Sequence, residues 1–441
     1  MYDINNHLDT INSNMDAING NFDAINNCRD KIIHDRETIN ALMLSYNDAL
    51  ARVLAAASPL AAEPVAITDA PGRALAADVV ANENLPPFDN SAVDGYALRG
   101  DFTVLPVTLR VSHTVFAGDD AGIMPDDDGV CVRVMTGAPV PVGAERVVMQ
   151  EDTEPLGDGI AAVRVMDAGS PRFIRRAGSD VKTGETVLNA GDIVDAGAVG
   201  LFASLGIGSV SCPAKPRVGI LSTGDELVAY TTRTLAPAKI RDSNRHALAV
   251  AVEAAGGIVD GSLHAPDNPD AIREALLSLS GCDIVISSGG VSVGSADYVK
   301  AIVEEIGTLT FWRVAIKPGK PLAFGSIGNA VFFGLPGNPA SSLVTFELFV
   351  RPVIRRFAGH TETSRPQITA TLTHDLPHET GRREFIRARL EYKNGVAYAT
   401  PTGAQTSHRT ASYVGANALL VAHEDHGDYA AGETLPALLL V

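Results

Sequence analysis

Cysteine is scarce in this chain, and the few cysteines lie far apart. Cys28, Cys131, Cys212 and Cys282 are spread over 441 residues and form no C-x-x-C pair. This spacing excludes a zinc-finger ligand set and is typical of proteins from a reduced compartment. The sequence also lacks a run of about 18 apolar residues and an N-terminal signal-peptide core. We therefore expect a cytoplasmic protein with no membrane partner.

Positive charge is in short supply as well. The chain has 35 lysines and arginines against 52 aspartates and glutamates, which gives a net charge of −17. A nucleic-acid partner would favour a basic face, so we expect no nucleic acid to bind. Small anions remain possible ligands where basic residues cluster locally. With 46% hydrophobic residues, the chain can bury large cores, and its length allows about three domains.

The first 42 residues differ from the rest because they are rich in Asn and Asp. A phrase Asp-x-Ile-Asn repeats every seven residues, at 9–12, 16–19 and 23–26. Apolar residues alternate four and three apart, at Ile4, Leu8, Ile11, Met15, Ile18, Phe22 and Ile25. Such heptads predict a coiled-coil-like helix that oligomerises or docks. The alternative is a frayed extension without function.

Residues 283–298, DIVISSGGVSVGSADY, are the stretch around which the other motifs are arranged. The apolar run 284–286 predicts a buried parallel strand, and the Ser-Ser-Gly-Gly turn after it lets backbone N–H groups approach an anion. Ser295 is placed to cap a helix over 296–306. The pattern indicates a phosphate cradle, with Asp297 beside it to hold a divalent cation. The alternative is an ordinary turn in which Asp297 complements the helix dipole.

Strands and helices alternate from residue 216 to about 360, which predicts a doubly wound parallel sheet. The loop 222–226, Ser-Thr-Gly-Asp-Glu, and the Ser-Ser-Gly-Gly turn both follow predicted strands. Ligands of such sheets bind outside the carboxyl ends of the strands. The loop 312–320 adds three basic residues, and Pro339 opens a predicted helix over 340–357. We expect this edge of the sheet to bind a phosphorylated substrate together with a metal ion.

Six motifs, in order along the chain, resemble one family. They are PPFDNSAVDGYA, MTGAPVPVGAERVV, STGDEL, SSGGVSVGSADY, IKPGKP and GLPGNPASS. This set is similar to that of the molybdopterin molybdenumtransferases, which include bacterial MoeA and the E domains of gephyrin and of the plant molybdenum insertase. The resemblance covers residues 43–441 and leaves 1–42 outside it.

The resemblance implies a Mg²⁺-dependent molybdenum insertase. Such an enzyme transfers molybdate into adenylylated molybdopterin and releases AMP. It implies an elongated homodimer whose site lies between the α/β domain of one subunit and a β-rich domain of the other. The implied domains are a heptad extension 1–42, a first domain from 43–84 and 166–212, an inserted β-rich domain 85–165, an α/β molybdopterin-binding domain 213–360 and a C-terminal β domain 361–441.

The resemblance also assigns roles to single residues. Asp94 and Thr136 would reach the cleft across the dimer. Glu226, Asp267 and Asp297 would lie near the metal and the pyrophosphate, with Glu226 and Asp297 supporting Mg²⁺. The turn residues that would hold the substrate are Ser288, Gly289, Gly290 and Ser292. The residues that would neutralise pterin phosphate or molybdate are Arg313, Lys317 and Lys320. Pro336 and Pro339 would shape the molybdate pocket, and Arg387 and Ser407 would close it.

Two other functions fit parts of this pattern. One is the adenylyltransferase that prepares the substrate, which shares the α/β module but lacks the long β-rich parts. The other is a non-enzymatic scaffold like gephyrin, which the heptad segment favours. A pure scaffold would have no need of intact aspartate and lysine loops.

Overall fold

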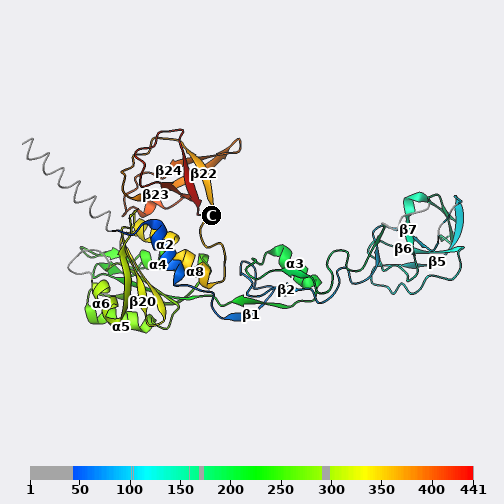
Figure 1. The fold of residues 1–441 in the computed structure, drawn as a ribbon, viewed down its shortest axis with the longest axis horizontal. Coiled ribbons are helices and arrows are strands. Elements are labelled where there is room, and N and C mark those ends of the chain that lie inside the picture. The colour runs from blue at the N-terminus through cyan, green and yellow to red at the C-terminus, as the bar shows by residue number, and fades with distance from the viewer. Residues whose placement is uncertain are drawn as a thin grey trace, which may run out of the picture. The chain divides into compact units, whose positions relative to one another are not determined.

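The computed structural model describes residues 43–100, 102, 104–157, 159–167, 173–290 and 298–440. These residues form two compact units, one from 62–212 and one from 43–61 with 213–440 (Figure 1). The predicted heptad helix over 1–42, and Ser292, Ser295 and Asp297, lie outside the described residues.

The α/β unit is built on a six-stranded sheet. Its strand order is β16 (Ile258–Ala265), β13 (Arg217–Thr223), β17 (Ile284–Ser288), β21 (Ala330–Leu335), β20 (Pro321–Ile327) and β18 (Gly307–Arg313). The first four strands are parallel, as predicted. β20 runs antiparallel to β21, because a direct turn at 328–329 joins the two strands. β20 also runs antiparallel to β18.

Helices cover both faces of this sheet, which confirms the doubly wound architecture (Figure 1). Alternation along β17 divides the core, since Ile284 and Ile286 face one side and Val285 the other. The first side is covered by α4 (Asn244–Ala254), α7 (Pro339–Thr345) and α8 (Arg351–Phe357). The other side is covered by α5 (Pro269–Leu279) and α6 (Tyr298–Ile306). The predicted helix over 340–357 is interrupted by a π-helical turn at Phe346–Val350, which separates α7 from α8.

Residues 43–61 belong to the α/β unit, whereas the sequence placed them with the β-rich first domain. Their helix α2 (Tyr46–Ala55) is capped by Ser45, whose hydroxyl accepts from the backbone N–H of Asp48. The apolar face of α2 buries Ala49 and Val53 in the same core as α8. Burial of this face therefore decides to which unit the segment belongs.

The C-terminal domain is a closed β structure within the same unit. Its strands are β22 (Gln367–Leu372), β23 (Arg383–Lys393), β24 (Val396–Pro401), β25 (Ala418–Ala422) and β26 (Thr434–Leu439). They pair in the order β23-β24-β22-β26-β25, and β25 pairs back onto β23. The two-residue strand β19 (Ile316–Lys317), from the basic loop of the α/β domain, adds in parallel to β23. Lys317 thereby lies opposite Glu384.

In the second unit, one small β module lies inside another. Its six-stranded sheet has the order β7 (Arg146–Met149), β4 (Gly95–Leu98), β6 (Val130–Val134), β5 (Val107–Val115), β9 (Ala162–Val165) and β8 (Thr153–Leu156). The chain on either side of this sheet pairs as β1 (Ala62–Ala66) with β12 (Ser209–Pro213), β2 (Val79–Val80) with β11 (Thr186–Leu188), and β3 (Asn90–Ser91) with β10 (Ile174–Arg175). Helix α3 (Ala196–Ser204) packs with the outer part. Among the described residues, no helix is long and apolar enough to cross a membrane.

Candidate functional site

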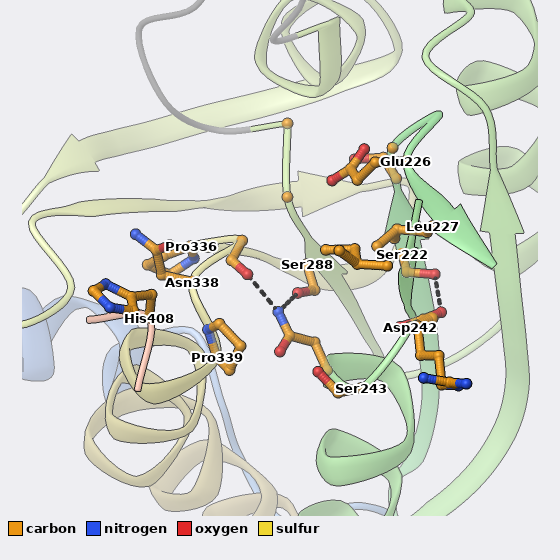
Figure 2. A pocket seen from close by; sticks show the side chains of 18 of the residues that line it. Ser222, Glu226, Leu227, Asp242, Ser243, Ser288, Pro336, Asn338, Pro339 and His408 are labelled. Atoms are coloured by element: carbon orange, nitrogen blue, oxygen red, sulfur yellow. Dashed lines mark hydrogen bonds between the residues drawn. The ribbon is translucent and has the colours of Figure 1, made fainter. Parts of the chain in front are cut away.

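A cavity of about 600 Å³ opens where β13, β17 and β21 end, as the sheet topology predicts (Figure 2). Its walls come from the loops after these strands, from the start of α4 and from one residue of the C-terminal domain. The lining residues include Ser222, Thr223, Glu226, Asp242, Asn244, Asp267, Ser288, Gly289, Gly290, Pro336, Gly337, Pro339 and His408. The two predicted ligand loops, 222–226 and 287–290, therefore lie in one cavity.

The Ser-Ser-Gly-Gly turn needs its glycines for two reasons. Gly289 and Gly290 have φ values of +96° and +69°, which disfavour residues with a Cβ. A Cβ on Gly290 would lie 2.5 Å from a side-chain carbon of Val299, and one on Gly289 would lie 3.0 Å from the carbonyl oxygen of Thr223. The bare backbone of the turn thus lines the cavity, where a ligand can approach it closely.

Asn244 ties two of the cavity's loops together. Its amide nitrogen donates to the Ser288 hydroxyl at 2.9 Å and to the carbonyl oxygen of Gly337 at 2.7 Å. The loop after β17 and the loop after β21 are therefore held by one side chain from the first turn of α4. Sequence reasoning missed Asn244, the first residue of α4.

The carboxylates of the cavity differ in their partners. Asp242 is buried and accepts from the Ser222 hydroxyl at 2.6 Å and from Arg245 Nε at 2.8 Å. Burial raises the pKa of Asp242, but these hydrogen bonds outweigh burial and the pKa lies below its ordinary value. Asp242 thus has a structural role. Glu226 and Asp267 also line the cavity. The backbone N–H of Asp267 donates to the Asp225 carboxylate at 3.1 Å, and the backbone N–H of Asp225 donates to the Asp267 carboxylate at 3.3 Å. These two hydrogen bonds join the loops that carry the residues.

A second cavity of about 460 Å³ adjoins the first and is basic. The two share Pro321, Pro336, Asn338 and His408 as a common wall. The other residues that line the second cavity are Lys317, Pro318, Gly319, Lys320, Ser341, Arg382, Gln405, Thr406 and Ser407. Asn338 donates to the Ser407 hydroxyl at 3.1 Å, which ties the C-terminal domain to the α/β domain beside the cavity.

The structure distributes the predicted residues over these two cavities. Those that line the first are Glu226, Asp267, Ser288, Gly289, Gly290, Pro336 and Pro339. Lys317, Lys320 and Ser407 line the second, which Pro336 also borders. Arg313 ends strand β18 and lines neither cavity.

Arg387 is placed differently from the prediction. Its side chain is fully buried, and the guanidinium donates to the Ser412 hydroxyl at 3.0 and 3.2 Å and to the Thr406 carbonyl at 3.3 Å. Arg387 therefore supports the loop 405–412 from behind, and Arg382 is the arginine that lines the cavity. Both belong to the arginine-rich segment 382–389, but Arg382 precedes β23, whereas Arg387 lies within the continuously buried stretch 384–388 of that strand.

Asp94 and Thr136, from separate loops of the second unit, are in direct contact. The backbone N–H and the hydroxyl of Thr136 donate to the same Asp94 oxygen at 2.7 and 2.8 Å. These two hydrogen bonds lower the pKa of Asp94. The pair is thus a preformed polar group on the β-rich unit.

Family models match three parts of the chain in order. Residues 44–206 match the MoeA N-terminal region, described as domains I and II. Residues 219–356 match a probable molybdopterin binding domain. Residues 369–440 match the MoeA C-terminal region, described as domain IV.

Known proteins are similar over most of the chain. It is 39% identical over 383 residues to the molybdopterin molybdenumtransferase of Haemophilus influenzae, covering 86% of this chain and 93% of that protein. It is 34% identical over 433 residues to gephyrin of Dictyostelium discoideum, covering 86% of this chain and 59% of that protein. A crystal structure of the molybdopterin biosynthesis MoeA protein of Pyrococcus horikoshii superposes with a TM-score of 0.77 at 28% identity, covering 90% of this chain and 99% of that one.

Proposed function

The chain belongs to the molybdopterin molybdenumtransferase family and is an enzyme of molybdenum cofactor synthesis, and from this premise we propose its reaction. The site transfers molybdate into adenylylated molybdopterin and releases AMP. One observation carries the proposal: a cavity with a glycine turn and carboxylates shares a wall with a cavity lined by two lysines and an arginine. An oxyanion and a pyrophosphate can therefore be bound side by side.

The first cavity suits the pyrophosphate of the substrate. The turn at Gly289 and Gly290 exposes backbone that a phosphate oxygen can approach. The Thr223 hydroxyl lines the same cavity, and its oxygen is buried without a hydrogen-bond partner in the protein. A buried hydroxyl without a partner is unfavourable, so a polar group of the substrate is the expected partner.

The donor set of this cavity fits Mg²⁺. Mg²⁺ in proteins is commonly held by one or two carboxylates together with substrate phosphates and water. Glu226 and Asp267 supply carboxylates at the cavity wall. Bound there, the ion would neutralise charge at the pyrophosphate. We keep Glu226 and Asp297 as the proposed ligands, with Asp267 beside them.

The second cavity suits molybdate, a tetrahedral dianion. Lys317, Lys320 and Arg382 bring positive charge to its wall, and Ser407 brings a hydroxyl. Pro336 lines both cavities, and Pro339 lines the first. Arg387 would hold the loop that carries Ser407, in place of contacting the anion itself. Arg313, which lines neither cavity, would contribute positive charge from outside them.

The β-rich unit supplies the remaining part of the proposed site. Asp94 and Thr136 would come from the second copy of a homodimer, so each site would need both chains. Residues 1–42 would add further association or docking. The reaction uses no protein nucleophile, because neutralisation of charge and alignment of the phosphates are the main requirements for cleaving a phosphoanhydride.

The test is AMP release from adenylylated molybdopterin with Mg²⁺ and molybdate. We expect molybdate-dependent release by the wild type and a loss of about 100-fold in Lys317→Met, since removing one preorganised charge donor costs about that much. Arg389→Met is the matched control, because Arg389 is an exposed cation on β23, the strand with which β19 pairs, and is itself paired with Glu391. It should release AMP like the wild type.

Other outcomes of this assay would favour the rival functions. Binding of adenylylated molybdopterin without turnover would overturn the insertase and favour a scaffold. Consumption of ATP with unmodified molybdopterin, without release of AMP from the adenylylated form, would favour an adenylyltransferase.

A further inference from the structure

Lys317, at the wall of the basic cavity, is backed by two buried residues of the C-terminal domain. Its ammonium lies 3.1 Å from Glu384 Oε2, and His378 Nδ1 lies 3.0 Å from the same oxygen. The side chains of Glu384 and His378 are 6% and 1% exposed, whereas that of Lys317 is 40% exposed. Only the lysine can therefore reach a ligand. The question is what the buried pair does for it.

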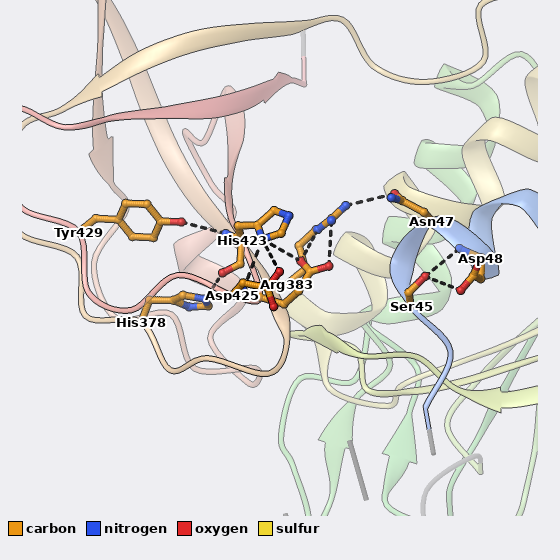
Figure 3. Close-up of polar contacts among 9 residues, drawn as sticks. Ser45, Asn47, Asp48, His378, Arg383, His423, Asp425 and Tyr429 are labelled. Atoms are coloured by element: carbon orange, nitrogen blue, oxygen red, sulfur yellow. Dashed lines mark hydrogen bonds and ion pairs between the residues drawn. The ribbon is translucent and has the colours of Figure 1, made fainter. Parts of the chain in front are cut away.

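The second ring nitrogen of His378 fixes where its hydrogens are. Nε2 lies 3.0 Å from the backbone carbonyl oxygen of His423, beside the loop drawn in Figure 3. A carbonyl oxygen only accepts, so Nε2 carries a hydrogen. Nδ1 then faces a carboxylate oxygen. Without a hydrogen between them, a lone pair and a carboxylate oxygen would repel each other at 3.0 Å inside the protein.

A proton therefore lies between His378 Nδ1 and Glu384 Oε2. If it rests on the imidazole, the pair consists of one cation and one anion. If it rests on the carboxyl group, both partners are neutral. In either arrangement the pair has no net charge, so the charge of Lys317 is not cancelled by Glu384.

We propose that His378 and Glu384 are positioning residues for Lys317, which together hold its ammonium at the cavity wall and leave its full positive charge for an oxyanion. This inference rests on the proposed molybdate role of the cavity. Glu384 alone would also hold the ammonium, but it would neutralise it. Because His378 shares a proton with Glu384, the carboxylate holds the ammonium without cancelling its charge.

The backbone fixes all three residues. Strand β19 places Lys317 directly opposite Glu384 of β23. The backbone N–H of His378 donates to Asp428 at 2.8 Å, and the Tyr429 ring packs 6.1 Å from the imidazole. Arg387 interacts electrostatically with Glu384 from within the domain. Lys317 is therefore held by an arrangement that forms before the ligand binds.

The charge count makes opposite predictions for two substitutions, which are measured as molybdate affinity of the full chain by isothermal titration calorimetry. His378→Gln removes the group that shares the proton, so Glu384 carries a full negative charge beside Lys317. We expect molybdate to bind about three- to tenfold more weakly, the effect of one added negative charge at a partly exposed site. Glu384→Gln leaves His378 neutral and Lys317 charged. We expect the affinity to stay within about threefold of the wild type.

The double variant and a matched control complete the experiment. His378→Gln with Glu384→Gln should bind molybdate more tightly than His378→Gln alone, because the negative charge of Glu384 is gone. His374→Gln is the control, since His374 is an exposed histidine of the same segment whose ring contacts the Thr373 hydroxyl. It should bind like the wild type. In turnover, His378→Gln should raise the KM for molybdate with little change in kcat.

Two results would contradict the role of His378: wild-type molybdate affinity in His378→Gln, or no recovery of molybdate affinity in the double variant. A third result would also overturn the inference. If Glu384→Gln bound molybdate more than about tenfold more tightly than the wild type, Glu384 would have cancelled the charge of Lys317. Failure of the proposed function looks different. In that case Lys317→Met would bind molybdate as well as the wild type does.

Discussion

At the scale of single residues, Ser222 has a structural role in addition to its position at the cavity wall. Its hydroxyl donates at 2.6 Å to Asp242, a carboxylate that is only 2% exposed (Figure 2). Arg245 supplies the charge partner. A buried carboxylate that loses a donor is costly, so Ser222 contributes to the stability of the cavity floor as well as lining it.

We predict that Ser222→Ala lowers the free energy of unfolding by about 1–2 kcal/mol. The matched control is Ser204→Ala, which removes a hydroxyl that donates to a backbone carbonyl on the exposed face of α3. The melting temperature at pH 7 measures both. A loss in Ser222→Ala no larger than in Ser204→Ala would contradict this role.

The same substitution has a predicted pH dependence. The pKa of Asp242 in the folded protein lies below its ordinary value of 3.8. Its stabilising contribution is therefore complete above pH 3.8 and is lost as the pH falls through the lower, folded-state pKa. The difference in melting temperature between the wild type and Ser222→Ala should be largest near neutral pH and should narrow in acid.

At the scale of elements, Arg383 joins three parts of the α/β unit (Figure 3). It begins β23, and its guanidinium donates to both carboxylate oxygens of Glu424 at 2.7 and 2.9 Å. It also donates to Asn47 of α2 at 3.2 Å and lies 5.3 Å from the centre of the Tyr46 ring. Helix α2 is thus bound to the C-terminal domain at the start of β23, the strand that carries Glu384.

We predict that Arg383→Ala destabilises the protein by about 1–2 kcal/mol, because a bidentate, partly buried ion pair is lost. Arg389→Ala, on the same strand, should cost less than about 0.5 kcal/mol, since its partner Glu391 is also exposed. Calorimetric melting temperatures measure both. Combining Arg383→Ala with Glu424→Ala should add little to the loss from either alone. Simple addition of the two losses would mean that the pair does not act as a unit.

At the scale of the whole molecule, the proposed site would need two chains. Asp94→Ala and Lys317→Met should each lower AMP release by about 100-fold when present in every subunit. In a randomly mixed preparation, half of the dimers contain one chain of each kind. Each such dimer has one complete site, so we predict recovery of about one quarter of wild-type activity. Activity no higher than that of either variant alone would show that Asp94 and Lys317 act within one chain or that the chains do not pair.

Much of the candidate site could be predicted because its signals are local. The buried strand 284–286, the glycine turn after it and the carboxyl-end position of both ligand loops follow from hydrophobic pattern and turn chemistry. The side chains that complete the site were harder to find. Asn244, Arg382 and His408 come from three separate elements, and their convergence depends on packing over long sequence distances.

The sequence by itself determined the order of the domains, the parallel core of the sheet and the family, because these depend on periodicity and on motifs that are each contiguous. The tertiary structure alone decided that residues 43–61 join the α/β unit, that Arg382 faces the basic cavity while Arg387 is buried, and that Lys317 lies opposite Glu384. Each of these depends on which apolar surface is buried and on which strands pair, and neither is encoded in neighbouring residues.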